Sequence, residues 1–249
     1  MARNSDALLW NPVRYPAPAM DDLPPRNTHQ PPSDRTRVRR GRERARYGRA
    51  QVLEILDSGV IAHVGVSTPD GPLVLPMAYG RDDEMLYLHG AIANHLLNSG
   101  EEQEICAAVT HLDGLVMARS PFHNSMNYRS VVVRGRGRRI TDDRRKLEAL
   151  RLITDHVVPH WDDVRPPSRS ELRKTLVLEL PLAEASAKVR TGDPIDDPED
   201  IEGPWWAGTV PITTRFGRPN PSSDLVHGIG VPAFVTALTD SAVDQRPGS

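Results

Sequence analysis

The sequence has few features of secreted or membrane proteins. It contains one cysteine, Cys106, so an internal disulfide is excluded. No apolar run approaches the roughly 20 residues that a membrane-spanning helix needs. The first 20 residues also lack the apolar segment of a secretory signal. We therefore expect a cytoplasmic protein with no membrane contact, and we expect Cys106, within the apolar run ICAAV, to be buried in a strand.

Several motifs for cofactors and metals are also missing. There is no GxGxxG after a predicted strand and no GxxxxGK[ST], which excludes a dinucleotide fingerprint and a P-loop. The nine histidines include no HExxH, and a single cysteine cannot form a thiolate zinc site. No GxSxG nucleophile motif occurs. We therefore predict no metal site.

Positive charge is concentrated in one segment. The net charge is -2, so the chain as a whole has no basic excess for nucleic acid. Residues 33–49 nevertheless hold eight arginines and only two acidic residues. These arginines either contact nucleic acid or pair with carboxylates on the body or on a partner subunit. The acidic balance of the chain favours the second interpretation, and we expect no nucleic-acid partner.

Composition divides the chain into three parts. Residues 1–34 are rich in proline and have no lasting apolar period, which indicates an extended N-terminal arm. Residues 35–238 carry the periodic patterns of one folded domain. Residues 239–249 are expected to form a flexible tail.

The patterns predict a mainly β fold with helical insertions. Apolar faces at helical spacing predict helices over 51–59 and 142–158. Alternating or apolar runs bounded by turn signals predict strands over 60–67, 72–80, 85–90, 105–112, 114–120, 127–140, 175–182 and 205–212. Residues 105–112 and 114–120 are expected to form a hairpin around Asp113 and Gly114. Strands in hairpin order indicate an antiparallel barrel.

The stretch LYLHGAIANHLL, residues 86–97, is a strand that meets a His-Gly corner before a short predicted helix. A helix N-terminus favours an anion such as phosphate. The stretch has no lysine or arginine, and only a protonated His95 supplies positive charge.

Four segments occur here in the order in which they occur in one known family. They are HVGV…DGPLVLPMAYGRDDEMLYLHG, LDGLVMARSPFHNSMNYRSVVVRGRGR, EASAKVRTGDPIDDPED and WWAGTVPI. From about Arg35 to Pro219, the chain resembles the pyridoxamine 5'-phosphate oxidase-like family of flavin-nucleotide-binding proteins. The resemblance implies an FMN-binding split β-barrel, a homodimer with the cofactor at the subunit interface, and a small-molecule substrate.

The resemblance also implies a set of site residues. His89 and Tyr79 are the candidate catalytic residues at the reactive face of the flavin. The candidate cofactor-binding residues are Pro76, Met77, Ala78, Tyr79, His89, Gly90, Asn94, His95, Tyr128, Arg129, Ser130, Lys188, Arg190 and Trp206. Lys188 and Arg190, two residues apart, lie on one face of an extended chain. Alternatives are an ordinary barrel strand for 76–79, an interface salt bridge for Arg129 and core packing for Trp206.

The corner departs from the family pattern. Relatives typically read like HGSxxSR, whereas this chain has Ala91, Asn94 and His95 at the changed places. Three hypotheses follow. The first is an FMN-dependent oxidoreductase. The second is a haem-binding barrel, for which the candidate axial ligands are His63, His89, His95, His111 and His123. The third is a barrel that works without a cofactor in binding or non-redox chemistry.

Overall fold

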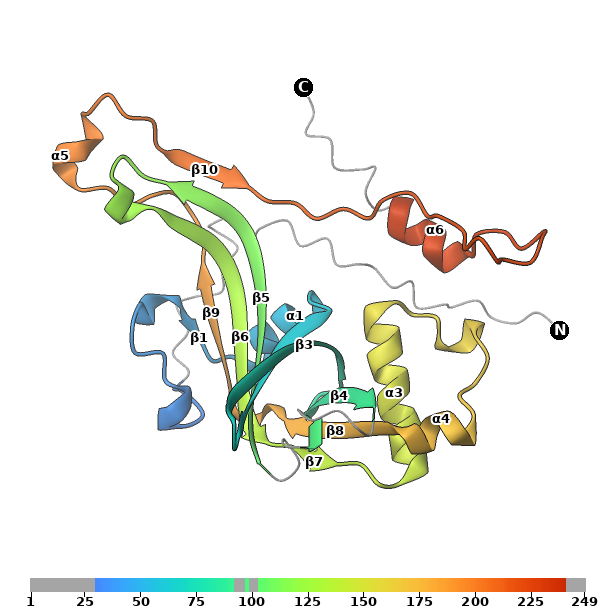
Figure 1. Cartoon of the computed structure of the whole chain (residues 1–249). Coiled ribbons are helices and arrows are strands. Elements are labelled where there is room, and N and C mark those ends of the chain that lie inside the picture. The colour runs from blue at the N-terminus through green and yellow to red at the C-terminus, as the bar shows by residue number, and fades with distance from the viewer. Residues whose placement is uncertain (1–29, 92–96, 99–102, 241–249) are drawn as a thin grey trace. The chain divides into compact units, whose positions relative to one another are not determined.

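A computed structural model describes residues 30–91, 97–98 and 103–240 (Figure 1). Residues 30–212 belong to one compact unit that contains every strand of the described chain. Residues 213–240 belong to a second unit and include the helix α6 (Ala233–Asp240). No helix among these described residues is both long enough and apolar enough to cross a membrane.

The strands form one mainly antiparallel sheet, which confirms the predicted mainly β fold. Its order is β1-β9-β6-β5-β2-β3-β4-β8-β7, and β10 pairs with β5. The strands are β1 (Ala45–Arg46), β2 (Ile61–Thr68), β3 (Gly71–Arg81), β4 (Met85–Ala91), β5 (Glu104–Met117), β6 (Ser125–Arg136), β7 (Arg138–Arg139), β8 (Thr175–Pro181), β9 (Ala185–Arg190) and β10 (Gly208–Pro211).

In the described part of the first unit, α-helices run over α1 (Arg49–Asp57), α3 (Asp143–Val157), α4 (Arg169–Lys174) and α5 (Pro198–Ile201). Helices α1, α3 and α4 contact strands of this sheet. The predicted helix over 142–158 is confirmed, with Asp142 as its N-cap accepting from the N–H of Arg145. Ser168 and Glu171 form a capping box that starts α4. In Figure 1, α3 lies beside β4 and β8.

Two apolar clusters hold the unit together. The larger one lies inside the barrel and includes Leu56, Tyr79, Leu88 and Leu178, all fully buried. The smaller one joins β4 and β8 to α3 through Tyr87, Ile153 and Val177. Because successive side chains on a strand point to opposite faces, β4 and β8 contribute to both clusters. One face of the β4–β8 pair therefore packs against α3, and the other face points into the barrel.

The prediction of a hairpin around Asp113 and Gly114 is wrong. Residues 104–117 form the single strand β5, which pairs with β6 along its whole length. The register shifts between Leu112 and Gly114, so the turn-like dipeptide forms a bulge instead of a turn. A bulge inserts one residue without reversing the strand. An Asp-Gly dipeptide is typical of a turn and of a bulge, so the sequence does not distinguish them.

The predicted burial of Cys106 is also wrong, because its side chain is exposed. Its neighbours Ile105 and Ala107 are buried in the barrel. Strict alternation along β5 therefore turns Cys106 to the outer face of the sheet. The apolar run ICAAV gave no information on which of its two faces lies inside.

Most arginines of the segment 33–49 have acceptors within the unit. Arg35 binds both Glu104 and Glu184, and Arg49 binds Glu84. Asp34 is shared by two more arginines of the segment, Arg37 and Arg39. These contacts fit the carboxylate-pairing interpretation. Since all of these pairs are largely exposed, each contributes little to stability.

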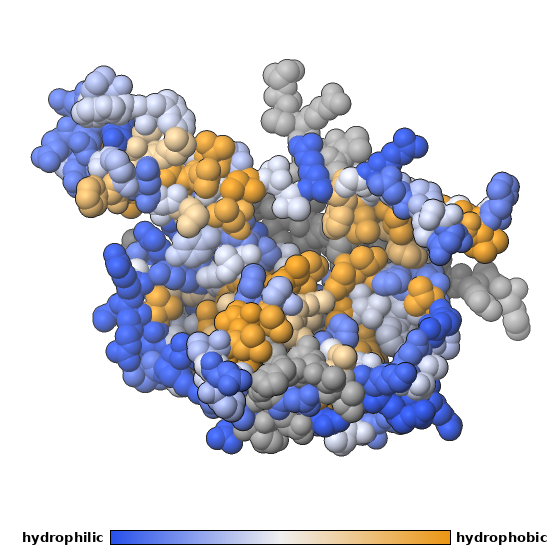
Figure 2. All heavy atoms as spheres, in the orientation of Figure 1, coloured by the Kyte–Doolittle hydropathy of each residue, from blue (hydrophilic) through white to orange (hydrophobic). Residues whose placement is uncertain are grey.

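The outer parts of β5 and β6 extend beyond the barrel and carry β10 (Figure 1). We call residues 113–127 and 205–212 the arm. Leu115 lies opposite Met126 on β6 and opposite Val210 on β10, and these three side chains are 43%, 49% and 44% exposed. Figure 2 shows apolar atoms gathered over the β10 part of the arm. A three-stranded face of this kind normally packs against another surface.

Candidate functional site

The strands β3 and β4 separate at a point that we call the fork. Residues 71–78 of β3 pair with β2, whereas Tyr79 to Arg81 pair with β4. The β3–β4 ladder begins at the pair Tyr79 and Leu88, so Ala78 and His89 are the first residues beyond it. In the described residues, the facing edges of 76–78 and 89–91 have no strand partner on this side. Backbone N–H and C=O groups on such edges are available to a ligand.

His89 lies at the fork with an unsatisfied ring nitrogen. It pairs with Val177 on β8 and therefore points to the same face as the α3 cluster. Its Nδ1 atom is buried and has no hydrogen-bond partner. Burial lowers the pKa of His89, so the ring is neutral near pH 7. A buried ring nitrogen without a partner costs free energy that a bound ligand group can recover.

The structure corrects the predicted catalytic role of the Tyr79 side chain. Tyr79 is fully buried in the barrel cluster. Its hydroxyl lies 2.5 Å from the carbonyl oxygen of Leu56 and 3.0 Å from that of Gly59. Burial raises the pKa of Tyr79 well above its ordinary value. The phenol therefore satisfies backbone acceptors at the end of α1, and no part of its ring is available to a cofactor.

Two histidines complete this end of α1. The Nε2 atom of His111 lies 3.0 Å from the carbonyl of Ile55, and the Nε2 atom of His156 lies 2.6 Å from the carbonyl of Gly59. A carbonyl oxygen only accepts, so each Nε2 carries the hydrogen. With Tyr79, whose ring centroid is 4.6 Å from that of His156, they satisfy acceptors that a helix C-terminus leaves open.

We expect acid pH to destabilise the fold through these buried histidines. Burial is the main cause that lowers the pKa of His89, His111 and His156 below the ordinary 6.5. As the pH falls below 6.5, the unfolded chain binds protons that the folded state resists, so the free energy of unfolding decreases. Urea unfolding from pH 5 to 7 measures this. His111→Gln with His156→Gln should flatten the dependence, and equal stability at pH 5 and 7 in the natural chain would contradict the assignment.

Arg129 is held by an ion pair within its own chain. Its Nε and Nη2 atoms donate to the two carboxylate oxygens of Asp113 at 3.0 and 2.8 Å. Its Nη1 atom also lies 3.3 Å from the hydroxyl of Ser58. Asp113, the bulge residue of β5, is thus the ion-pair partner of Arg129, whereas the sequence analysis treated it as part of a turn. The sequence analysis offered a cofactor contact or an interface salt bridge for Arg129. In the structure, Arg129 instead forms an ion pair inside one protomer.

The register of β6 and β9 separates the predicted cations. Tyr128 lies opposite Arg190, and Ser130 lies opposite Lys188. These four residues share one face, which we call the basic face, and the predicted shared face of Lys188 and Arg190 is confirmed. Arg129 lies opposite Val189 and points to the other side of the sheet. Within one protomer, Arg129 therefore does not share a face with Lys188 and Arg190.

Arg190 is a buried cation, 7% exposed, without a counter-charge on its own acceptors. Its guanidinium donates to the side-chain oxygen of Asn127 and, at 3.0 Å each, to the carbonyls of Gly192 and Asp193. Burial, followed by the charge of Arg44, lowers the pKa of Arg190. Arg190 itself has only neutral acceptors, which favours an anion beside it, whereas Arg44 already pairs with a carboxylate oxygen of Glu43 at 3.3 Å. Arg44, hidden in the arginine-rich segment, had no individual signal in the sequence.

The side chains of the remaining predicted residues are not brought to His89 or to the basic face in the described chain. Trp206 is 64% exposed on the arm, which excludes core packing within the protomer. Pro76 is exposed on β3, while Met77 packs against the barrel cluster. Asn94 and His95, with most of the predicted short helix, lie outside the described residues. Three strands separate β3 from β9 in the sheet, so the sheet order does not make the fork and the basic face neighbours.

A metal centre finds no support in the described ranges. No group of three or more histidine, cysteine, aspartate or glutamate side chains there is arranged to hold an ion. The candidate site therefore consists of the fork with His89 and the basic face with Lys188 and Arg190.

Comparisons with known proteins identify relatives of this fold. A family model described as pyridoxamine 5'-phosphate oxidase matches residues 48–189. The solved structure of the flavocytochrome Anf3 from Azotobacter vinelandii is 40% identical, with a TM-score of 0.81 over 84% of this chain and 99% of that chain. The FAD and haem binding protein from Mycobacterium smegmatis is 33% identical, with a TM-score of 0.75 over 79% and 97%. No curated protein matches. The chain therefore belongs to the pyridoxamine 5'-phosphate oxidase-like family of split-barrel proteins.

Proposed function

We propose that this protein is a flavin-dependent oxidoreductase that acts as a homodimer on a small-molecule substrate. The observation that carries the proposal is the fork, where a buried ring nitrogen without a partner lies beside unpaired strand edges. The heteroatoms along the edge of a flavin ring suit such groups, because they both donate and accept hydrogen bonds. When bound, the flavin supplies hydride and electron transfer between a reduced cofactor and an organic substrate or oxygen.

The chain's own residues bind and orient the cofactor. His89 and the backbone of 76–78 would hold the ring at the fork, as the family resemblance implies. Lys188 and Arg190, with Arg44 nearby, would hold phosphate by charge-assisted hydrogen bonds. Because Arg190 is already fixed by three acceptors, its guanidinium is preorganised and loses little entropy on binding.

The separation of the two groups supports a dimer. The fork and the basic face are not neighbours in the sheet order. Two copies of the chain would bring the fork of one protomer to the basic face of the other. The exposed apolar side chains of the arm, among them Leu115, Met126 and Val210, supply a surface for such a contact. Trp206 on the same arm would then contact the partner's cofactor.

The sequence resemblance by itself implies FMN as the flavin nucleotide. Two observations favour FAD. The M. smegmatis relative is described as an FAD and haem binding protein. Lys188, Arg190 and Arg44, which is paired with Glu43, also lie in one region, and this number of cations suits a diphosphate better than a single phosphate. We therefore expect FAD to bind more tightly than FMN.

Replacing His89 with alanine should weaken flavin binding about tenfold, because one hydrogen bond to the ring is lost. Titration of the apoprotein with FAD and FMN, followed by flavin fluorescence, measures both affinities. Sedimentation detected in the flavin absorption band should show the cofactor on a dimer. His227→Ala, an exposed histidine of the second unit, is the matched control. A chain that takes up neither flavin would overturn the proposal and favour the cofactor-free barrel.

Haem binding is a second proposed function. The two relatives reported above are a flavocytochrome and an FAD and haem binding protein, and they match at 40% and 33% identity over most of both chains. A haem site requires a histidine ligand next to apolar walls. Of the candidate ligands named from the sequence, His63, His89, His111 and His123 lie among the described residues. Reconstitution of the full chain with haemin tests the proposal. A protein-bound Soret band supports it, and a spectrum of free haemin alone contradicts it.

A further inference from the structure

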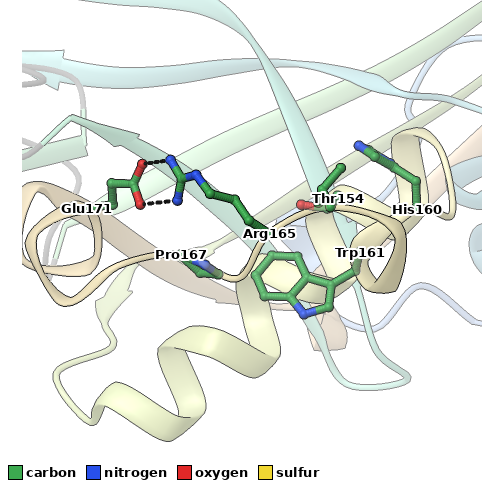
Figure 3. Close-up of a pocket in the computed structure, with 7 residues that line it drawn as sticks. Thr154, His160, Trp161, Arg165, Pro167 and Glu171 are labelled. Atoms are coloured by element: carbon green, nitrogen blue, oxygen red, sulfur yellow. Dashed lines mark hydrogen bonds and ion pairs between the residues drawn. The ribbon is translucent and has the colours of Figure 1, made fainter. Parts of the chain in front are cut away.

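Two arginines of this chain are held by carboxylates. Arg129 donates from two nitrogen atoms to the two oxygens of Asp113. In the pocket between α3 and α4, Arg165 donates from Nη1 and Nη2 to the two oxygens of Glu171 at 2.9 and 2.6 Å (Figure 3). In both pairs the acceptor that fixes the guanidinium also compensates its charge. These arginines therefore offer little to a bound anion.

Arg190 is held without a carboxylate. Its Nη1 atom donates to the side-chain oxygen of Asn127 and, at 3.0 Å, to the carbonyl of Gly192. Its Nη2 atom donates to the backbone carbonyl of Asp193 at 3.0 Å, whereas the carboxylate of Asp193 belongs to an exposed side chain. All three acceptors are neutral, although Arg190 itself is buried. A buried cation with no counter-charge is costly and is typical of a functional site.

Asn127 connects Arg190 to the segment that follows β9. The β6–β9 ladder ends at the pair of Tyr128 and Arg190, so Asn127 is the first residue of β6 beyond it. Its Nδ2 atom donates to the carbonyl of Gly192 at 3.2 Å, and its Oδ1 atom accepts from Arg190. A guanidinium only donates and a carbonyl only accepts, which determines the orientation of the amide. One side chain therefore fixes both the guanidinium and a carbonyl that the guanidinium also binds.

These bonds leave one edge of the guanidinium open. A guanidinium has five N–H donors, and three of them are used here. The Nε atom of Arg190 has no acceptor among the described residues and, unlike the Nε atom of Arg119, it is not enclosed. Nε and the second N–H of Nη2 form a two-donor edge. Arg129 uses the same two nitrogen atoms to bind both oxygens of Asp113, and a phosphate fits such an edge equally well.

Lys188 adds a second cation on the same face. It lies two residues before Arg190 on β9, so the two side chains point to one side of the sheet. Within the described ranges, neither Lys188 nor Arg190 has a carboxylate partner. The nearby cation Arg44 is paired with Glu43. Two uncompensated cations suit a terminal phosphate, which carries about two negative charges near neutral pH.

We propose that Asn127 is a positioning residue for the phosphate of the flavin nucleotide, because it fixes Arg190 with the Nε edge free and leaves the charge of Arg190 uncompensated. The inference rests on the proposed function, in which the basic face holds phosphate. A carboxylate at position 127 would accept the same hydrogen bond from Arg190 but would neutralise its charge. Asn127 had no individual signal in the sequence, since an asparagine on a strand has many structural uses.

The test compares the affinities of the natural chain and of Asn127→Asp for FMN and for riboflavin, which is the same flavin without a phosphate. The ratio of the two dissociation constants isolates the contribution of the phosphate, whereas a general loss of structure weakens both ligands alike. The natural chain should bind FMN at least about tenfold more tightly than riboflavin. Asn127→Asp should lower this preference about tenfold and leave riboflavin affinity nearly unchanged. Flavin fluorescence measures both affinities.

Asn127→Ala is the second variant. It removes the acceptor and adds no charge, so the preference for FMN should fall by only about threefold. Inorganic phosphate should compete with FMN for the natural apoprotein and should not compete with riboflavin. Asn124→Asp is the matched control, because the side-chain oxygen of Asn124 is also an acceptor, from the N–H of Ala118 at 2.8 Å. It should keep the natural preference, and far-UV circular dichroism shows whether each variant is folded.

The outcomes separate the role of Asn127 from the proposed function. A natural chain that binds riboflavin as tightly as FMN, or binds neither, would overturn both the phosphate role of the basic face and the role of Asn127. If the natural chain prefers FMN and the folded Asn127 variants keep the same preference, the role of Asn127 is wrong while the proposed function stands. Equal losses of FMN and riboflavin affinity would also overturn it, since Asn127 would then only stabilise the fold. If Asn127→Asp does not fold, the preference of Asn127→Ala decides.

Discussion

Replacing Gly80 with alanine is expected to lower the free energy of unfolding by about 3 kcal/mol, because overpacking at this position meets backbone. A Cβ atom at Gly80 would lie 2.5 Å from the backbone nitrogen of Ile153 and 2.5 Å from the carbonyl carbon of Leu152. Real Cβ atoms do not approach other atoms so closely, so α3 has to move away from β3. That movement would also pull His156 from the end of α1.

Gly65→Ala is the matched control for this experiment. Gly65 also lies within a strand, but a Cβ atom there would meet Val74 at an ordinary 3.5 Å. We expect it to be neutral or to stabilise by about 0.5 kcal/mol, since alanine loses less backbone entropy than glycine on folding. Urea unfolding of both variants gives the comparison. If Gly80→Ala were as stable as Gly65→Ala, α3 would not pack on β3 as described.

The second large effect is expected at Tyr79. Tyr79→Phe should lower the free energy of unfolding by about 2 kcal/mol, because the buried carbonyls of Leu56 and Gly59 lose their shared donor. Flavin affinity should change less than twofold, since no part of this side chain reaches a ligand. Urea unfolding and flavin titration on the same preparation measure the two quantities.

Tyr47→Phe provides the control for the loss of a tyrosine hydroxyl. The Tyr47 hydroxyl accepts the N–H of Val38 at 2.8 Å in a partly exposed region, so water can replace it and the loss should be about 0.5 kcal/mol. A Tyr79→Phe protein with natural stability but impaired flavin binding or reduction would restore the catalytic role that the sequence suggested. The two variants together separate a structural hydroxyl from a functional one.

Errors at individual positions have one common origin. The sequence pattern of ICAAVTHLDG identified a strand and a local irregularity, and both are present in β5. Whether Asp113 and Gly114 form a turn or a bulge depends on whether the next residues continue along β6, which is a long-range pairing. The exposure of Cys106 depends in the same way on which side of β5 faces the barrel. Local patterns contain no information about either.

The sequence by itself determined the consecutive antiparallel strands between residues 60 and 90, the helix after Asp142 and the family, because each depends on residues close together in the chain or on ordered motifs. Only the tertiary structure decided that Tyr79 is buried, that Arg129 points away from Lys188, and that the buried Nδ1 of His89 lacks a partner. The physical reason is that burial, facing and pairing are properties of contacts between distant segments. The type of a residue and its sequence neighbours limit the interactions that its side chain can make. The register of the sheet decides which face the side chain is on and which partners it meets.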